Sequence, residues 1–396
     1  MVPRCLFPCL PSWHFYDAHV TILVGAAVAA PSPTARQTAA HRVLVSVIFL
    51  AALMASGGLL RRCLPFPLVP GIRETIEHLA RYGDDYDVLF LGSSRVHFQI
   101  LPAIFDQIAR EQGVPTHSFN TGARAMVPPE DGYLLDQILL RPHQHLRWVF
   151  VEIMPFDNTQ GVGFLAGTGR DTYWHDFERT WLLTERAIQD CKTLGGDSDR
   201  AKVPSSEKIW DLGQQFGFWL HNLGLFVKNY SNLGRGSACL MERLGLDREW
   251  IEHSPDRDKT WDGWNFPVIA KEFTEKRRAD YERSYASLLE TKQRFNAGDA
   301  LSWDALRAKI DRLKEEKVVP ILIIPPTVNA TRYLPTQLAK QSLTVLDFSD
   351  PREYPELFTL DHRLDGSHLN YDGAELFTKA LVRKFLETIK KSGQAP

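Results

Sequence analysis

The sequence predicts an α/β fold, a three-layer sandwich in which helices cover both faces of a parallel sheet of about five strands. Three observations lead to this prediction. Short apolar runs recur along the chain, segments with helical periodicity lie between them, and the runs are apolar throughout rather than alternating with polar residues. Continuously apolar strands separated by helices are typical of a parallel sheet that is buried on both faces. The predicted strands are 88–91, 116–120, 147–154, 318–324 and 344–348.

Helices are predicted between these strands and after the last one. Pro102 stands near the first turn of the first such helix, a position that proline tolerates. The closing helix ends on Lys390 and Lys391, whose charges suit the negative end of a helix dipole. The predicted helices are 102–111, 133–140, 303–316 and 372–391, with a further charged helix near 269–295.

Length and composition exclude several classes of protein. A chain of 396 residues, 44% hydrophobic and 24% charged, has room for one large globular domain or two smaller ones. The formal net charge of −2 gives no reason to expect a nucleic-acid partner. Five cysteines occur without a C-x-x-C pair, so neither a disulfide framework nor a zinc site is indicated. We therefore expect no metal and no organic cofactor.

Residues 43–60 form an uncharged run of the length that crosses a bilayer. We expect a transmembrane helix there, a disordered segment over 1–42 and the α/β domain over 71–396. A removed signal peptide is a poorer explanation because too many residues precede the run; a buried core helix stays an alternative. Arginines flank the run on both sides, so the orientation is only weakly indicated. We expect a membrane-anchored protein whose domain lies on the extracytoplasmic side, periplasmic or extracellular.

The third and fourth predicted strands are much further apart than a normal crossover requires. We interpret about 159–300 as a largely helical insertion into the α/β domain. Its tryptophans either form its own core or line an aromatic groove that binds a ligand. They are Trp174, Trp181, Trp210, Trp219, Trp250, Trp261 and Trp264.

Three residues from two remote segments suggest nucleophilic catalysis. The first strand ends at Gly92-Ser93-Ser94, at the carboxyl edge of the sheet, where ligands bind in such folds. Asp365 and His368 stand three residues apart just before the closing helix. A histidine that acts as general base needs a carboxylate on its other ring nitrogen. The pattern therefore predicts a nucleophile, a base and an orienting acid.

These two blocks resemble the SGNH/GDSL family of esterases and acyl transferases. That family begins with a strand followed by Gly-Asp-Ser and ends with Asp-x-x-His before a terminal helix. Ser93 replaces the usual aspartate, a variant that is similar to membrane-anchored relatives acting on cell-envelope polymers. The resemblance covers about 87–158 and 303–391 and implies a flavodoxin-like fold with Ser94 as nucleophile.

The resemblance also implies an oxyanion hole made of the Ser94 amide, a glycine after the second strand and an asparagine after the third. Gly122 matches the glycine, although a tight turn would require glycine as well. The asparagine block does not match: Asn158 is displaced, and Asn120 is equally near the edge. A missing donor would cost on the order of 10²–10³ in rate.

Three further residues are candidates for substrate binding. Arg95 either binds an anionic substrate or pairs with a carboxylate such as Glu152, which would be costly to bury alone. Tyr173 and Trp174 begin the insertion and are candidates to stack on a sugar ring, or else belong to the core.

The sequence thus predicts a serine-dependent ester hydrolase or O-acyl transferase with the triad Ser94, His368 and Asp365. The expected substrate is an acylated carbohydrate or another small ester of the cell envelope. A non-catalytic scaffold or binding protein with the same fold is the alternative, and the missing asparagine block favours it.

Overall fold

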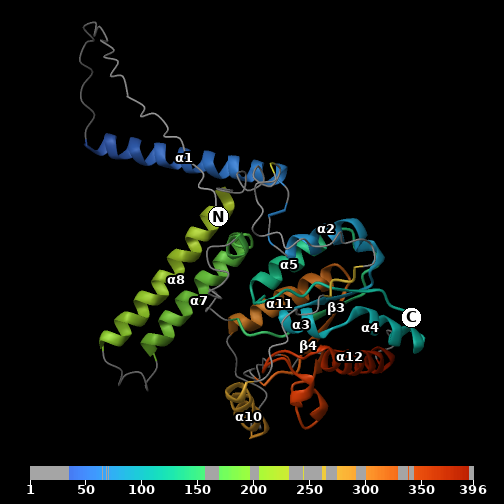
Figure 1. Ribbon diagram of the computed structural model, residues 1–396. Helices are drawn as coiled ribbons and strands as arrows, with labels where there is room; N and C mark the ends of the chain where they lie inside the picture. The colour runs from blue at the N-terminus through green and yellow to red at the C-terminus, as the bar shows by residue number, and fades with distance from the viewer. Residues whose placement is uncertain are drawn as a thin grey trace, which may run out of the picture. The chain divides into compact units, whose positions relative to one another are not determined.

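A computed structural model of the chain describes residues 35–391 with several gaps. The residues outside the description are 1–34, 65, 68, 70, 157–168, 197–204, 232–243, 245–260, 265–273, 291–299, 329–337, 339–342 and 392–396. The chain divides into two compact units, Met1–Ala52 and Leu53–Pro396. The α/β domain lies wholly in the larger unit (Figure 1).

The first helix, α1 (Ala35–Cys63), contains the predicted apolar run. Its window Thr38–Leu60 is long and apolar enough to cross a membrane, and only 6% of it is buried. The prediction of disorder over 1–42 is wrong for residues 35–42, which are helical. Alanine, glutamine and arginine are good helix formers, so the helix extends beyond the apolar run at little cost. The remainder of 1–42 lies outside the described residues.

The sheet has five parallel strands in the order β2-β1-β3-β4-β5, as predicted in number and direction. This order reverses direction between β1 and β3, and doubly wound sheets bind ligands at the carboxyl edge beside that point. Each strand begins within two residues of its predicted start and ends at its predicted end or before it. The strands are β1 (Val88–Leu91), β2 (Ser118–Asn120), β3 (Trp148–Glu152), β4 (Val319–Ile324) and β5 (Thr344–Asp347).

Helices cover both faces of the sheet and give two hydrophobic cores (Figure 1). Side chains alternate along a strand, so Leu89 and Leu91 enter one core while Val88 and Phe90 enter the other. The first core includes α2 (Ile72–Tyr82), α5 (Glu130–Leu139) and α11 (Ala300–Glu315). The second includes α4 (Pro102–Glu111) and α12 (Tyr371–Lys391). The continuously apolar strands of the sequence follow from burial on both sides.

The domain begins earlier than residue 71. Val69 is fully buried in the first core, and Phe66 packs against the same core. The ring of Phe66 meets that of Tyr173 edge to face at 5.9 Å. Phe66 and Val69, which stand between α1 and α2, are therefore part of the domain.

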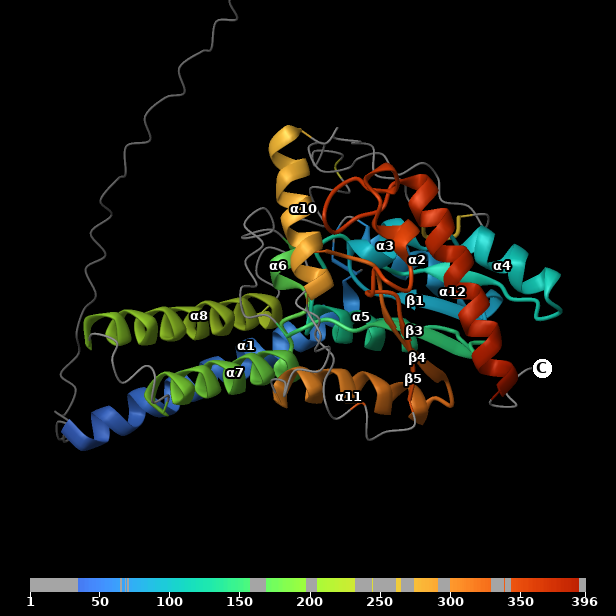
Figure 2. The ribbon, with the colours of Figure 1, turned by 90° about the horizontal axis from the view of Figure 1, so that it is seen from below.

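The described part of the insertion is mostly helical. It contains α6 (Gly169–Thr172), α7 (Phe177–Gly196), α8 (Ser205–Ser231) and α10 (Glu275–Glu290). Helices α7 and α8 lie side by side (Figure 2). Between α8 and α10, residues 261–264 return to the sheet, where the Asn120 N–H donates to the Asp262 carbonyl (2.8 Å). One segment of the insertion thus lies beside the carboxyl end of β2.

Candidate functional site

The two adjacent serines after β1 have different roles. Ser93 is the N-cap of the short helix α3 (Ser94–Gln99), and its hydroxyl accepts from the Arg95 N–H at 3.2 Å. A serine at this position satisfies one of the amides that a helix start leaves without a partner. Ser94 is the first residue of α3, and its side chain is partly exposed. Gly92 is required before them because a Cβ there would lie 2.5 Å from Glu152 Oε2.

Ser94, His368 and Asp365 form one connected chain of hydrogen bonds. Ser94 Oγ lies 2.8 Å from His368 Nε2. His368 Nδ1 lies 2.9 Å from Asp365 Oδ2 and 3.0 Å from Oδ1. Ser94 and His368 come from segments 274 residues apart in the sequence. The arrangement is that of a nucleophile, a general base and a carboxylate that orients the base.

The local turn fixes Asp365 beneath His368. Asp365 Oδ1 accepts the N–H groups of Ser367 (2.7 Å) and His368 (2.8 Å). Burial raises the pKa of Asp365, but the hydrogen bond and charge of His368 and the two amides outweigh it and lower the pKa below its ordinary value. The carboxylate therefore stays ionised, as a partner of an imidazolium must.

Gln99 joins the two halves of the site, and sequence reasoning missed it. Its buried side chain donates from Nε2 to the Ser367 carbonyl at 2.8 Å. The Gln99 carbonyl in turn accepts from Thr378 Oγ1 of α12 (3.2 Å). The helix that carries Ser94 is thereby tied to the turn that carries His368. The one sequence signal for Gln99 is its position three residues after the apolar Val96, a spacing that places both on the same side of a helix.

Arg95 pairs with Glu152, one of the two alternatives that the sequence left open. Arg95 Nε lies 2.6 Å from Glu152 Oε1, and Glu152 is fully buried at the end of β3. The other carboxylate oxygen accepts the Ser93 N–H at 2.6 Å. The pair satisfies a charge that would be costly to bury alone. It also links the end of β3 to the turn before Ser94.

The predicted oxyanion hole is only partly assembled. The Gly122 N–H donates to Asn120 Oδ1 at 2.9 Å, so this amide already has a partner. Asn120 Nδ2 donates to the carbonyls of Val96 and Ile100, both at 2.9 Å, and is equally engaged. Asn158 lies outside the described residues. The Ser94 amide stands at the first position of α3, where a backbone N–H has no acceptor within the helix.

Tyr173 and Trp174 belong to the first core, which corrects their expected role in stacking on a substrate. They are 1% and 5% exposed. The Tyr173 hydroxyl donates to Glu130 Oε1 at 2.8 Å, and the Trp174 ring stacks on His175. Neither ring has an open face, because both pack against the helices that cover the sheet.

A different tryptophan of the insertion, Trp264, contacts a neighbour of His368. Trp264 Nε1 donates to the Phe98 carbonyl at 3.2 Å, and the Phe98 ring meets the His368 ring edge to face at 5.8 Å. The partly exposed Tyr371 packs against Trp264 with ring centroids 5.9 Å apart. The guanidinium of Arg124, an exposed residue, lies 6.0 Å from the centre of the Phe98 ring. We call Phe98, Trp264 and Tyr371 the aromatic wall, of which Phe98 is the member whose ring meets His368.

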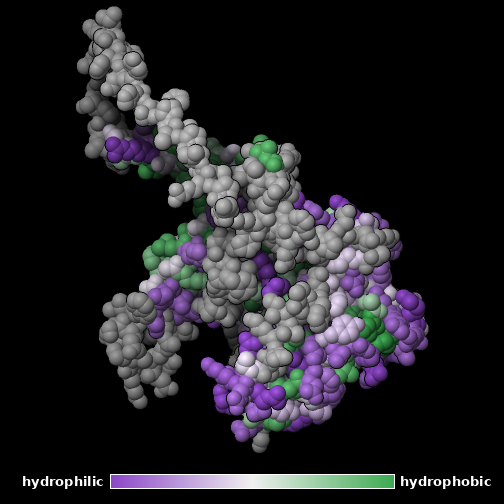
Figure 3. Space-filling model, in the orientation of Figure 1, coloured by the Kyte–Doolittle hydropathy of each residue, from purple (hydrophilic) through white to green (hydrophobic). Residues whose placement is uncertain are grey.

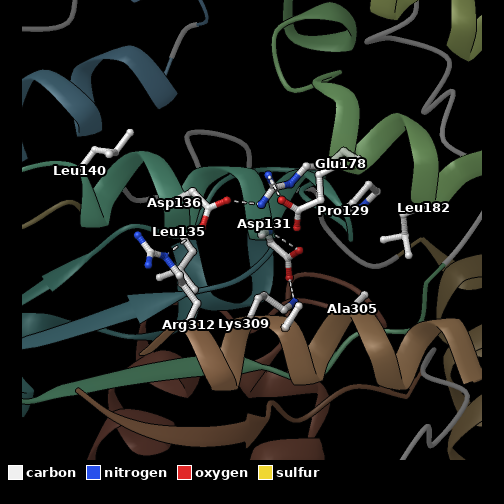
Figure 4. A pocket seen from close by; sticks show the side chains of 13 residues that line it. Pro129, Asp131, Leu135, Asp136, Leu140, Glu178, Leu182, Ala305, Lys309 and Arg312 are labelled. Atoms are coloured by element: carbon white, nitrogen blue, oxygen red, sulfur yellow. Dashed lines mark hydrogen bonds and ion pairs between the residues drawn. The ribbon is translucent and has the colours of Figure 1, made fainter. Parts of the chain in front are cut away.

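A cavity of about 360 Å³ lies away from the triad, between α5, α7 and α11 (Figure 4). Its charges are already paired: Asp131 points to Lys309, and Asp136 points to Arg179. Neither Ser94 nor His368 lines it. Within the described ranges, no group of three or more histidine, cysteine, aspartate or glutamate side chains is arranged to hold a metal ion.

Comparison with family models, with curated proteins and with solved structures gives no match for this chain.

Proposed function

We propose that the protein is a serine-dependent ester hydrolase or O-acyl transferase with an SGNH-like fold. The observation that carries this proposal is the chain of hydrogen bonds from Ser94 through His368 to Asp365. It stands at the carboxyl edge of a parallel sheet, beside the point where the strand order reverses.

In the proposed mechanism His368 Nε2 removes the Ser94 proton as Oγ attacks the ester carbonyl. Asp365 holds the ring in the tautomer that leaves Nε2 free to accept and stabilises the imidazolium that forms. The Ser94 amide donates to the developing oxyanion. Collapse of the tetrahedral intermediate leaves an acyl group on Ser94 and returns the proton to the departing alcohol. Water or an acceptor hydroxyl then releases the acyl group by the reverse steps.

The proposed substrate is an acylated carbohydrate or another small ester of the cell envelope, outside the cytoplasm. The aromatic wall of Phe98, Trp264 and Tyr371 supports a sugar because the apolar faces of sugar rings suit aromatic side chains. The apolar helix α1 supports a membrane-bound location.

The test of the triad is covalent labelling with a fluorophosphonate probe. We expect Ser94→Ala to abolish labelling and His368→Ala and Asp365→Asn to reduce it strongly. The matched control is the neighbouring Ser93→Ala, which removes an N-cap at a cost of about 1 kcal/mol and should retain labelling. Equal labelling of the parent chain and Ser94→Ala, both folded by circular dichroism, would sink the assignment.

A transferase is a second candidate because an aromatic wall beside the acyl-enzyme can bind an acceptor and keep water out. We expect acetylated sugar when the protein meets a chromogenic acetyl ester together with oligosaccharides, detected by mass spectrometry. Hydrolysis that no sugar alters would instead leave a plain esterase.

A non-catalytic scaffold is the remaining candidate. The engaged amide of Gly122 supports it, since it leaves the oxyanion with one donor fewer than the resemblance implies. Absence of both labelling and hydrolysis in the folded parent chain would favour this candidate.

A further inference from the structure

Helix α8 carries large apolar side chains on its exposed side as well as on the side that packs against the domain, where Leu225 is buried. Large apolar side chains on one side of the helix are exposed, with Phe216 at 59% and Leu220 at 46%. Their spacing of three and four residues places them on a single stripe. We call this stripe the outer face of α8. It consists of Leu212, Phe216, Leu220, Leu223 and Val227.

Two polar side chains of α8, those of Asn222 and Asn229, point inward. Asn229 Nδ2 donates to the carbonyls of Tyr173 (3.1 Å) and His175 (2.9 Å). Asn222 Oδ1 accepts from His175 Nε2 at 2.8 Å. Both asparagines are buried. Hydrogen bonds from these asparagines, together with the buried Leu225, therefore fix the inner side of the helix to the domain.

The outer face is also uncharged over a long stretch. No Asp, Glu, Lys or Arg occurs from Leu212 to Val227, and the sole titratable residue there, His221, lies 3.7 Å from Asp171. Figure 3 shows hydrophobic surface where Figure 1 draws α8. Five large apolar side chains exposed along one helix mark an interaction site, because soluble proteins rarely expose contiguous apolar patches.

The end of α8 lies against Gly57, in the part of α1 that belongs to the larger unit. Gly57 belongs to the larger unit, and a Cβ at this glycine would overlap the Tyr230 carbonyl. Gly57 stands three residues before Leu60, the end of the apolar window, which is about 5 Å along a helix. The last turn of α8 is therefore level with the boundary of the segment that can enter a bilayer.

We infer that the outer face of α8 lies in the lipid interface as a second membrane contact next to α1. Its uncharged stretch of 16 residues is about 24 Å long, too short to cross a hydrocarbon core of about 30 Å. The inward-facing asparagines also hold it on the domain. A helix that has one apolar face but is too short to cross the bilayer lies in the plane of the lipid interface. The inference depends on α1 as anchor and is independent of the proposed catalysis.

Photo-cross-linking of the full chain tests this inference. The chain is reconstituted into vesicles of phosphatidylcholine and phosphatidylglycerol with p-benzoylphenylalanine at Phe216, Leu220 or Leu223. A photoreactive group at Phe49 of α1 is the positive control. Exposed positions on other helices, Arg307 of α11 and Glu111 of α4, are the matched negative controls.

We expect lipid adducts by mass spectrometry at the three α8 positions, several-fold above those at Arg307 and Glu111 and comparable with Phe49. Adducts at Phe49 with only background at α8 would overturn the inference. Cross-linked dimers at the α8 positions would overturn it in favour of a contact between two copies. Background levels of lipid adduct at both Phe49 and the α8 positions would show that α1 is not in the bilayer, which would overturn the inference as well.

Discussion

At the scale of single residues, the two adjacent serines in the turn after β1 make different contacts. Ser93 is turned back to cap α3, whereas Ser94 one position later faces His368. A helix start separates consecutive residues by about 100° around the axis, so two serines cannot share one direction. The buried carboxylate of Glu152 holds this turn through the Ser93 amide and the Arg95 guanidinium.

The pair Arg95–Glu152 should behave as a coupled unit. We expect Arg95→Gln to lower the free energy of unfolding by about 3 kcal/mol, because it leaves a fully buried carboxylate without its cation. Glu152→Gln should cost less, since Arg95 retains some solvent contact. The double variant should be more stable than the sum of both losses predicts. Urea denaturation of the detergent-solubilised chain measures all three.

The exposed pair Arg307–Asp311 of α11 provides the control. Arg307→Gln should change stability by less than about 1 kcal/mol, as is usual for surface ion pairs. Additive losses at positions 95 and 152 would contradict the coupling.

At the scale of elements, α8 is attached to the domain through the link before α7. His175 lies in this link, fully buried, with Nε2 donating to Asn222. Burial lowers the pKa of His175 from 6.5 to about 4, against the smaller opposing effect of the Asn222 hydrogen bond. The attachment of α8 thus requires a neutral imidazole.

Acidification from pH 6.5 to pH 4 should therefore weaken the fold at this element. In that window the unfolded chain binds a proton at His175 that the folded chain does not bind, so the free energy of unfolding falls as the pH falls. The full effect is about 3 kcal/mol, reached near pH 4, with no further contribution below it. The measurement is urea denaturation at several pH values.

His175→Gln keeps a donor for Asn222 and removes the titration. The variant should lose less stability than the parent chain between pH 6.5 and 4, while carboxylates elsewhere contribute equally to both proteins. An identical pH dependence of parent and variant would refute this role for His175.

At the scale of the whole molecule, α1 is the candidate membrane span. Its apolar window is 6% buried in the part of the chain that the structure describes. We expect the full chain to sediment with membranes and to resist carbonate extraction, because roughly 20 apolar residues are enough to span a bilayer. Immunoblots of the fractions measure this. Recovery of the full chain in the soluble fraction would contradict the anchor.

A chain that begins at Leu64 is the matched comparison, since it lacks α1 but keeps Phe66 and Val69 in the core. It should fold and be released by carbonate. If the outer face of α8 binds lipid as inferred, this shorter chain should still associate with vesicles in the absence of carbonate.

The sequence by itself determined the parallel sheet and the helices that cover it. Strands that are buried on both faces must be apolar throughout, so residues 88–91 and 319–324 could be predicted as strands from the sequence alone. The blocks at Ser94 and at Asp365 and His368 were equally apparent in the sequence, because a short turn fixes the spacing of Asp365 and His368. The location of Tyr173 and Trp174 could not be predicted in this way. The sequence around an aromatic residue does not distinguish a position in a core from one in a ligand-binding groove.

Only the tertiary structure decided which residues meet. Gln99 and the carbonyl of Ser367 are 268 residues apart, and no local pattern records their hydrogen bond. The pairing of Arg95 with Glu152 and the approach of Trp264 to Phe98 likewise arise from packing between remote segments. Local propensity and periodicity act within one element. A buried polar group pairs with a group that the fold brings within hydrogen-bonding distance. Leaving it without a hydrogen bond would cost free energy, so this pairing depends on the tertiary structure.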